Sequence, residues 1–420
     1  MSAADRSSLQ AHPFLIVSYP ILQVMSVNLH ECALTVMILP LLAANLFAAF
    51  LLWVMSKLMD KGEKAAIATS LSLFLLFLYG LFADATVGLF VPYHYHLVTI
   101  PIWLLLIGLL CKLLAGYEAE NKKLATFTSF FNSLGCFLVA IVSVLLLNEV
   151  YKVSQVQSPT FASKTHLQNL PEKPSSALPD VYYIILDGYS RNDVLRKQMG
   201  FDNSKFTKEL ERQGFYVARS SHSNYHSTVF SLNASLNLDY ISSPTPSYLA
   251  LLKSLEDSAV FRVFKHYGYK TEFHSSGGFE DVFHRYDNIY RTDIWMTNFS
   301  FITFHRSPLR PLVEHLKLRT KQKQTRGVLN NVLASPDRHS PDIPRFVLAH
   351  ILAPHTPYVL KADGSTVDSY HITKTHTEKE AYEAYTSYMQ YVNDWALKFV
   401  KKVKSIGKVA PVIILQADHG

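Results

Sequence analysis

Cysteine is scarce in this sequence, and charge is scarce in its first 150 positions. The 420 residues include 3 cysteines, Cys32, Cys111 and Cys136, which all lie in or beside long apolar runs. The rest of the chain has none, which excludes disulfide bonds and cysteine-bound metals there. The formal net charge is only +7. With so much apolar sequence and no dominant basic face, we expect no nucleic-acid partner.

Apolar runs fill the first 150 residues and predict a transmembrane bundle of about five α-helices. The runs are Pro13–Asn28, Leu34–Met55, Ala65–Phe82, Leu97–Leu110 and Phe127–Leu147. The first run has no formal charge, but it is short and contains Pro20, so it either spans thinly or re-enters the membrane. Several spans exclude a cleaved signal peptide as their explanation.

Loop charge predicts the orientation of this bundle. The stretches 57–64 and 112–123 each carry three lysines, whereas 84–96 has no lysine or arginine. Because positively charged loops stay in the cytoplasm, we expect the chain after Leu147 to lie outside it. The polar, proline-containing stretch 151–178 is typical of a linker. Residues 179–420 have the composition of a globular domain.

Two apolar stretches of this domain predict strands that end in acidic residues. The first, Pro179–Asp187, continues into Gly-Tyr, and the second runs from Pro411 into Asp418-His419-Gly. Open α/β sheets bind ligands where their strands end. Carboxylate oxygens with an imidazole nitrogen suit zinc, manganese or magnesium. Either strand end alone also fits an ordinary turn.

A third stretch, Ser223–Asn237, supplies a hydroxyl group. It follows the short strand-like run Gly214–Ala218. Apolar residues then recur at the spacing of one helix face, at Val229, Leu232 and Leu236. Thr228 therefore starts a helix, where free N–H groups and the dipole attract phosphate or sulfate. Its hydroxyl either caps the helix or acts as a nucleophile.

Together these three motifs resemble one family. The Asp187-Gly-Tyr turn, the Tyr-x-x-Thr-x-x-Ser-Leu-x-x-Ser-Leu-Asn run from Tyr225 and the Asp418-His-Gly end are similar to the sulfatase-like branch of the alkaline phosphatase superfamily. Similar members in plan are membrane-anchored phosphotransferases such as lipoteichoic acid synthase and phosphoethanolamine transferases. The resemblance covers residues 179–420. It implies an alkaline phosphatase-like α/β sandwich with an extracytoplasmic or periplasmic active site.

The resemblance also implies roles for individual residues. Thr228 is the expected nucleophile, and the expected ligands of one or more divalent metal ions (Mn, Zn or Mg) are Asp187, Thr228, Asp418 and His419. Two histidines of the domain are expected to contact the substrate, His355 in a His-x-Pro-Tyr turn and His274 after a strand. Each of these two is also open to an ordinary surface or core role. We expect His350 to serve packing.

The absence of one sulfatase motif bears on the expected reaction. Sulfatases of this superfamily form their nucleophile in a Cys/Ser-x-Pro-x-Arg motif, which this sequence lacks, and Thr228 stands in the matching place. We therefore expect transfer of a phosphoethanolamine or phosphoglycerol group from a membrane lipid, through phospho-Thr228, to an extracytoplasmic glycan or lipid. A sulfatase or phosphatase acting through the same residues, and a non-catalytic membrane relative, remain alternatives.

The last residue bears on this expectation. Family members normally continue beyond Asp-His-Gly, whereas this sequence stops at Gly420. We therefore expect a chain truncated at its C-terminus, whose own activity is an open question. The sequence leaves the oligomeric state undetermined.

Overall fold

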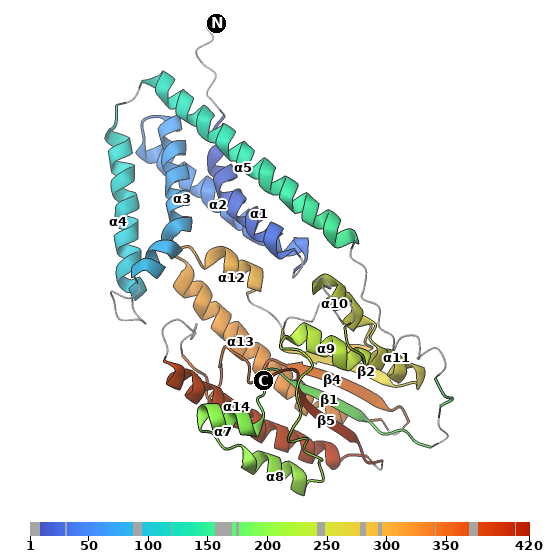
Figure 1. Ribbon diagram of the computed structural model, residues 1–420. Helices are drawn as coiled ribbons and strands as arrows, with labels where there is room; N and C mark the ends of the chain where they lie inside the picture. The colour runs from blue at the N-terminus through green and yellow to red at the C-terminus, as the bar shows by residue number, and fades with distance from the viewer. Residues whose placement is uncertain are drawn as a thin grey trace. The chain divides into compact units, whose positions relative to one another are not determined.

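A computed structural model describes residues 9–29, 32–86, 95–118, 120–155, 170–173, 176–241, 248–277, 283–292, 296–340, 342–368, 377–407 and 409–420. The chain divides into two compact units (Figure 1). The first unit combines Met1–Gln155 with Met296–Lys317, and the second combines Val156–Trp295 with Leu318–Gly420. Most of the expected linker, 156–169 with 174 and 175, lies outside the described residues.

The first unit is helical. Its elements are α1 (His12–Asn28), η1 (Leu34–Met37), α2 (Ile38–Leu58), α3 (Gly62–Thr86), α4 (Tyr95–Gly116), α5 (Asn121–Gln155) and α12 (Asn298–Phe304). Among the described residues, four helical stretches are long and apolar enough to cross a membrane: Leu34–Leu58, Gly62–Thr86, His96–Gly116 and Asn121–Gln155. These four stretches indicate a multi-pass membrane protein. The first expected span forms α1, which has 17 residues and contains Pro20, and it is not among the four.

The second unit is built on a parallel sheet. Its strands are β1 (Val181–Leu186), β2 (Lys270–Ser275), β3 (Asn288–Tyr290), β4 (Arg345–Ile351) and β5 (Val412–Ala417), in the order β3-β2-β4-β1-β5. All pairs are parallel. The central strands β1 and β4 are buried at every position. This explains their continuous apolar sequences, because a parallel sheet is covered on both faces.

Helices cover both faces of this sheet (Figure 1). They are α7 (Asn192–Met199), α8 (Ser204–Arg212), α9 (Thr228–Asn237), α10 (Tyr248–Glu256), α11 (Ala259–His266), α13 (Arg310–Leu333), η4 (Ser335–Arg338) and α14 (Glu378–Lys404). One core joins the sheet to α8, α13 and α14. A second core, on the opposite face, joins it to α9, α10 and α11. The expected apolar helical region followed by an α/β domain is thereby confirmed, with four long apolar helices among the described residues where about five were expected.

The strand-like run Gly214–Ala218 is not a strand. Phe215 N–H bonds the carbonyl of Leu210 at 3.0 Å, which closes the end of α8. Phe215 and Val217 pack on the core of α8, α13 and α14, whereas Tyr216 is 91 % exposed. The alternation in the sequence therefore reflects one-sided packing of an extended segment.

The amphipathic stretch before β5 forms α14 as the sequence predicts. Thr377 and Glu380 make a reciprocal capping box at its start, and lysines fill its last turn, which favours the helix dipole. On its buried face, Phe399 is 0 % exposed and stacks on Trp395 with ring centroids 5.5 Å apart.

We predict that Phe399→Ala destabilises the second unit by about 3–5 kcal/mol, because it removes a fully buried aromatic side chain and leaves a cavity. Denaturant unfolding in detergent micelles, followed by tryptophan fluorescence, measures the change because Trp395 touches the altered ring. The matched control is Asp394→Ala on the exposed face of α14, which should cost about 0.5 kcal/mol or less. Equal midpoints for the two variants would contradict this account of the core.

Candidate active site

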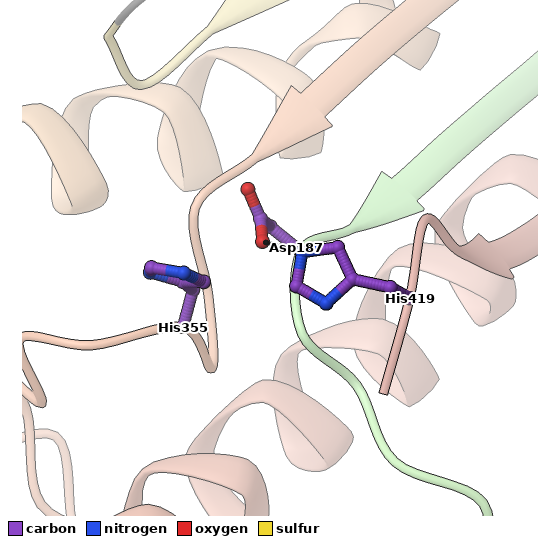
Figure 2. Close-up of side chains that lie close together, drawn as sticks. All are labelled: Asp187, His355 and His419. Atoms are coloured by element: carbon purple, nitrogen blue, oxygen red, sulfur yellow. Dashed lines mark ion pairs between the residues drawn. The ribbon is translucent and has the colours of Figure 1, made fainter. Parts of the chain in front are cut away.

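Three neighbouring strands deliver polar side chains to one edge of the sheet. Asp187 directly follows β1, and Asp418 and His419 follow β5. His350 is the last residue but one of β4, and His355 lies in the loop beyond it. Figure 2 shows Asp187, His355 and His419 coming together from these three strand ends. The parallel pairing of β4, β1 and β5 brings them there, as in other open α/β sheets.

Asp418 is fixed through one of its two carboxylate oxygens. Its Oδ1 accepts the backbone N–H of Gly188 at 3.0 Å and that of His419 at 2.8 Å. Gly188 has φ 67°, a left-handed conformation that suits glycine and turns its N–H toward Asp418. The other oxygen, Oδ2, is buried without a hydrogen-bond partner among the described residues, and it lies 3.4 Å from His419 Nε2.

Asp187 likewise has one carboxylate oxygen next to a polar group and one without a hydrogen-bond partner in the described part of the chain. Its Oδ2 lies 3.2 Å from Nε2 of His350. Its Oδ1 is buried without a hydrogen-bond partner among the described residues and lies 3.6 Å from His419 Nε2. Burial by itself raises the pKa of Asp187, but the close approach of His350 and the charges of the nearby histidines outweigh burial, so the pKa falls below its usual value. Asp187 is therefore anionic near neutral pH.

This cluster has the donor set of a metal site. Two sets of three ligand atoms are each compact, with all atoms of a set within 4.8 Å of one another. One set comes from Asp187, His355 and His419, and the other from Asp187, His350 and Asp418. Buried carboxylate oxygens without partners are costly unless a cation compensates them. Oxygen and imidazole ligands of this kind suit hard or borderline divalent ions. The residues present therefore fit a divalent metal ion.

Thr228 lies beside this cluster. It is the first residue of α9, and the N-cap position belongs to Ser227, whose side chain makes no capping hydrogen bond. Thr228 Oγ1 lies 3.4 Å from His419 Nε2 and is half-buried. The hydroxyl thus stands at the positive end of a helix dipole and next to the carboxylate and imidazole groups. A cap at this helix does not depend on the Thr228 side chain.

The loop after β1 is clamped by a tyrosine of α14. The hydroxyl of Tyr385 donates to the carbonyl of Gly188 at 2.8 Å and accepts the N–H of Ser190 at 2.9 Å. Tyr385 is 6 % exposed. Its two hydrogen bonds hold the turn that carries Asp187 and the N–H group bound to Asp418, and the aromatic stripe of α14 thus also supports the site.

The two expected substrate histidines have different surroundings. His355 is half-buried beside the site, with its ring centroid 6.2 Å from that of His419. Its Nδ1 lies 2.7 Å from the carbonyl of Thr356. Since a carbonyl only accepts, Nδ1 must carry the hydrogen. The Nε2 of neutral His355 is then an acceptor that is available to a ligand.

His274 is completely buried on another part of the sheet. Its Nε2 lies 3.5 Å from Glu272 Oε2, and its ring stacks on Tyr290 at 4.4 Å. Burial lowers the pKa of His274, and Glu272 offsets this only in part. It pairs in register with Ala349, whose side chain belongs to the core of α13 and α14. His274 belongs to neither group of metal-ligand atoms.

His350, by contrast, joins the site although the sequence indicated only packing. Its side chain is 2 % exposed and contacts Asp187. The sequence signal that could have indicated this role is the position of His350 near the end of β4. A histidine one residue before the end of a buried strand, next to a strand that ends in aspartate, can reach the same edge.

A parallel sheet with carboxylates, histidines and a helix-starting hydroxyl at the carboxyl ends of its strands forms a candidate metal centre. The sequence profile described as Sulfatase matches residues 179–420, which is more than half of the chain. The chain therefore belongs to the sulfatase family, part of the alkaline phosphatase superfamily. No curated protein and no solved structure gives a significant match.

We predict that His350→Ala lowers the affinity for a divalent metal at least about 10- to 100-fold, because His350 is a candidate ligand that also contacts Asp187, and loss of a group that only orients ligands already has effects of this size. Titration of the apoprotein with zinc against a chelating dye measures the affinity. The matched control is His274→Ala, which removes an equally buried histidine from the same sheet. Its zinc affinity should stay within about twofold of the parent. Equal affinity in all three proteins would remove His350 from the site.

Proposed function

We propose that this chain is a membrane-embedded phosphotransferase. In this proposal it takes a phosphoethanolamine- or phosphoglycerol-type group from a membrane lipid and passes it to a glycan or lipid on the extracytoplasmic side. The observation that carries the proposal is the position of Thr228, whose hydroxyl starts a helix 3.4 Å from His419 and beside two buried carboxylates. Family membership supports an enzyme of the hydrolase or transferase class.

The proposed nucleophile is Thr228. Its Oγ loses its proton and forms a bond to the lipid phosphorus, while the bond from phosphorus to the glycerol oxygen of the lipid breaks. The glycerol oxygen takes up a proton and leaves as the hydroxyl of diacylglycerol. The free N–H groups and the dipole of α9 hold the negative phosphoryl oxygens during this step. An acceptor hydroxyl then displaces Thr228 from phosphorus. The domain has no cysteine to provide the usual sulfatase nucleophile, which favours phosphoryl over sulfate chemistry.

Other side chains orient and support this chemistry. A divalent ion bound by Asp187, Thr228, Asp418 and His419 would lower the pKa of the threonine hydroxyl and neutralise phosphate charge. His355 presents Nε2 to the site because its Nδ1 hydrogen is used by the carbonyl of Thr356. In its protonated form His355 can donate from Nε2 to a phosphoryl oxygen or to the leaving oxygen.

A lipid donor is favoured by the membrane helices. A chain with four candidate spans and a catalytic family region keeps its active residues close to lipid substrates. A hydrolase is the second candidate, because the Sulfatase family match itself favours it. The two candidates share Thr228 and differ only in the acceptor, which is water for a hydrolase. Release of free headgroup without a transfer product would identify the hydrolase.

The nucleophile can be tested at Thr228. We predict that Thr228→Ala and Thr228→Asn lower turnover of a headgroup-labelled phospholipid at least about a thousandfold, as loss of a nucleophile does. Thr228→Ser should keep part of the activity because it keeps a hydroxyl. Intact-mass spectrometry after incubation with lipid should find a phospho-headgroup adduct on the parent and none on the Ala and Asn variants.

The control on the same helix is Ser235→Ala, which removes a hydroxyl bonded to Gln416 and leaves Thr228 unchanged. It should keep both turnover and adduct. Circular dichroism should give equal helix content for every variant. Full turnover by a folded Thr228→Asn protein would end both the transferase and the hydrolase proposals, since an asparagine cannot form the ester.

The side of the membrane is a separate prediction. From the lysines at 57–64 and 112–123 we predict that the sulfatase-family region lies outside the cytoplasm. In a variant without the three native cysteines, Tyr216→Cys should react with an impermeant maleimide on intact cells, because Tyr216 is 91 % exposed. Lys122→Cys should react only after permeabilisation. The reverse pattern would overturn the orientation.

A further inference from the structure

One segment of the sulfatase-family region belongs to the first, helical unit. Met296–Lys317 lies inside the matched range 179–420, yet it groups with Met1–Gln155. The segment contains α12 and the first turns of α13. On α12, Phe299 is 3 % exposed and shares a core with Val17, Ile21 and Met25 of α1. The chain thus returns to the membrane helices in the middle of its catalytic region.

The segment is fixed to one end of α3. The N–H of Gly80 donates to the carbonyl of Arg306 at 2.7 Å. A Cβ at Gly80 would lie 2.7 Å from the Cα of Arg306, so a side chain at Gly80 would prevent the contact. Near the end of α3, Asp84 Oδ1 accepts from Arg310 Nη1 at 2.6 Å. The contact is therefore specific and lies near the last turns of a candidate span.

The outer face of the segment is apolar. Ile302, Leu309 and Leu312 are 44 %, 50 % and 53 % exposed. On α3, Leu81 follows the docked Gly80 directly and is 54 % exposed, as a side chain facing acyl chains would be. These exposed apolar residues belong to a segment that is bonded to α3, a candidate membrane span. Exposed apolar groups that gather on one segment mark an interaction surface.

A basic residue lies at the contact with α3. Arg306 is exposed, and among the described residues its guanidinium makes no ion pair. A guanidinium on an apolar stem can keep its stem with the apolar groups and reach phosphate with its head. Apolar side chains with a cation at their border are the pattern of a segment lying in a membrane interface. A protein partner with an apolar surface would not account for the continuity with α3.

We propose that Ile302, Leu309, Leu312 and Arg306 form a phospholipid-binding surface, here called the lipid patch. The three apolar side chains enter the boundary of the acyl chains, and Arg306 binds lipid phosphate groups. Because α4 and α5 each cross once, the carboxyl ends of α3 and α5 lie on the same side of the membrane. The lipid patch therefore contacts the surface from which the sulfatase-family region emerges after Gln155.

Spin-label accessibility tests the lipid patch in the full chain. The three native cysteines are replaced by serine, and single labels are placed at Leu309→Cys, Leu312→Cys, Leu81→Cys or Tyr216→Cys. The protein is reconstituted in phosphatidylcholine–phosphatidylglycerol bilayers. We expect the labels at 309 and 312 to collide with oxygen as often as the label at 81 does. We expect their collision rates with a polar nickel chelate to be several-fold lower than the rate of the label at 216. Arg306→Glu should shift the label at 309 toward the nickel reagent.

Two other results would overturn the proposal. Labels at 309 and 312 that meet the nickel reagent as freely as the label at 216 would place these residues in water. Labels that meet neither reagent would show that protein, such as a second copy of this chain, covers the surface. If the cysteine-free chain does not fold, Leu309→Trp in the otherwise unchanged chain provides the same test. Brominated lipid should quench its added fluorescence, and absence of quenching would contradict lipid contact.

Discussion

Two buried carboxylates at neighbouring strand ends are the constraint on which the site depends. Asp187 and Asp418 are 3 % and 2 % exposed, and each uses one oxygen for positioning while the other has no hydrogen-bond partner among the described residues. Bringing two such groups together is unfavourable without compensating charge. The fold tolerates the pair because His350, His419 and backbone N–H groups surround it, and a divalent cation would offset the remaining charge.

The sequence predicts this edge of the sheet well because strand ends carry a strong local signal. Apolar runs ending in Asp187 and Asp418 are enough to place both carboxylates, since parallel strands end at one edge. The histidines are harder to place because register decides their faces. Ser275 pairs with His350, whereas His274 pairs with Ala349, so His350 and His274 lie on opposite faces of the sheet. A shift of one residue reverses this assignment, and no local pattern in either strand fixes it.

Thr228 shows the same limit at a helix start. Helical spacing predicts approximately where α9 begins. The choice between a capping and a chemical role for Thr228 depends on which of two adjacent residues, Ser227 or Thr228, holds the N-cap position. Ser227 occupies the cap position and leaves its side chain out of the cap, so the helix begins without using the hydroxyl of Thr228. That hydroxyl is directed at His419 instead. The packing of Met296–Lys317 on the helices of the first unit had no sequence signal, because α12 has only 7 residues and its partner surface is distant in the chain.

The family region is divided along the chain, because its segment Met296–Lys317 belongs to the first, helical unit. The chain leaves the helical unit after α5, forms β1, β2 and β3, and returns to that unit through α12 before it forms β4 and β5. Asp187 therefore precedes this return, and Asp418 follows it. Because β1 and β5 pair directly, the complete site requires that both parts of the chain come together while the segment between them is held at α3. Strand pairing therefore joins two carboxylates that are separated along the chain by a segment packed on α1 and α3.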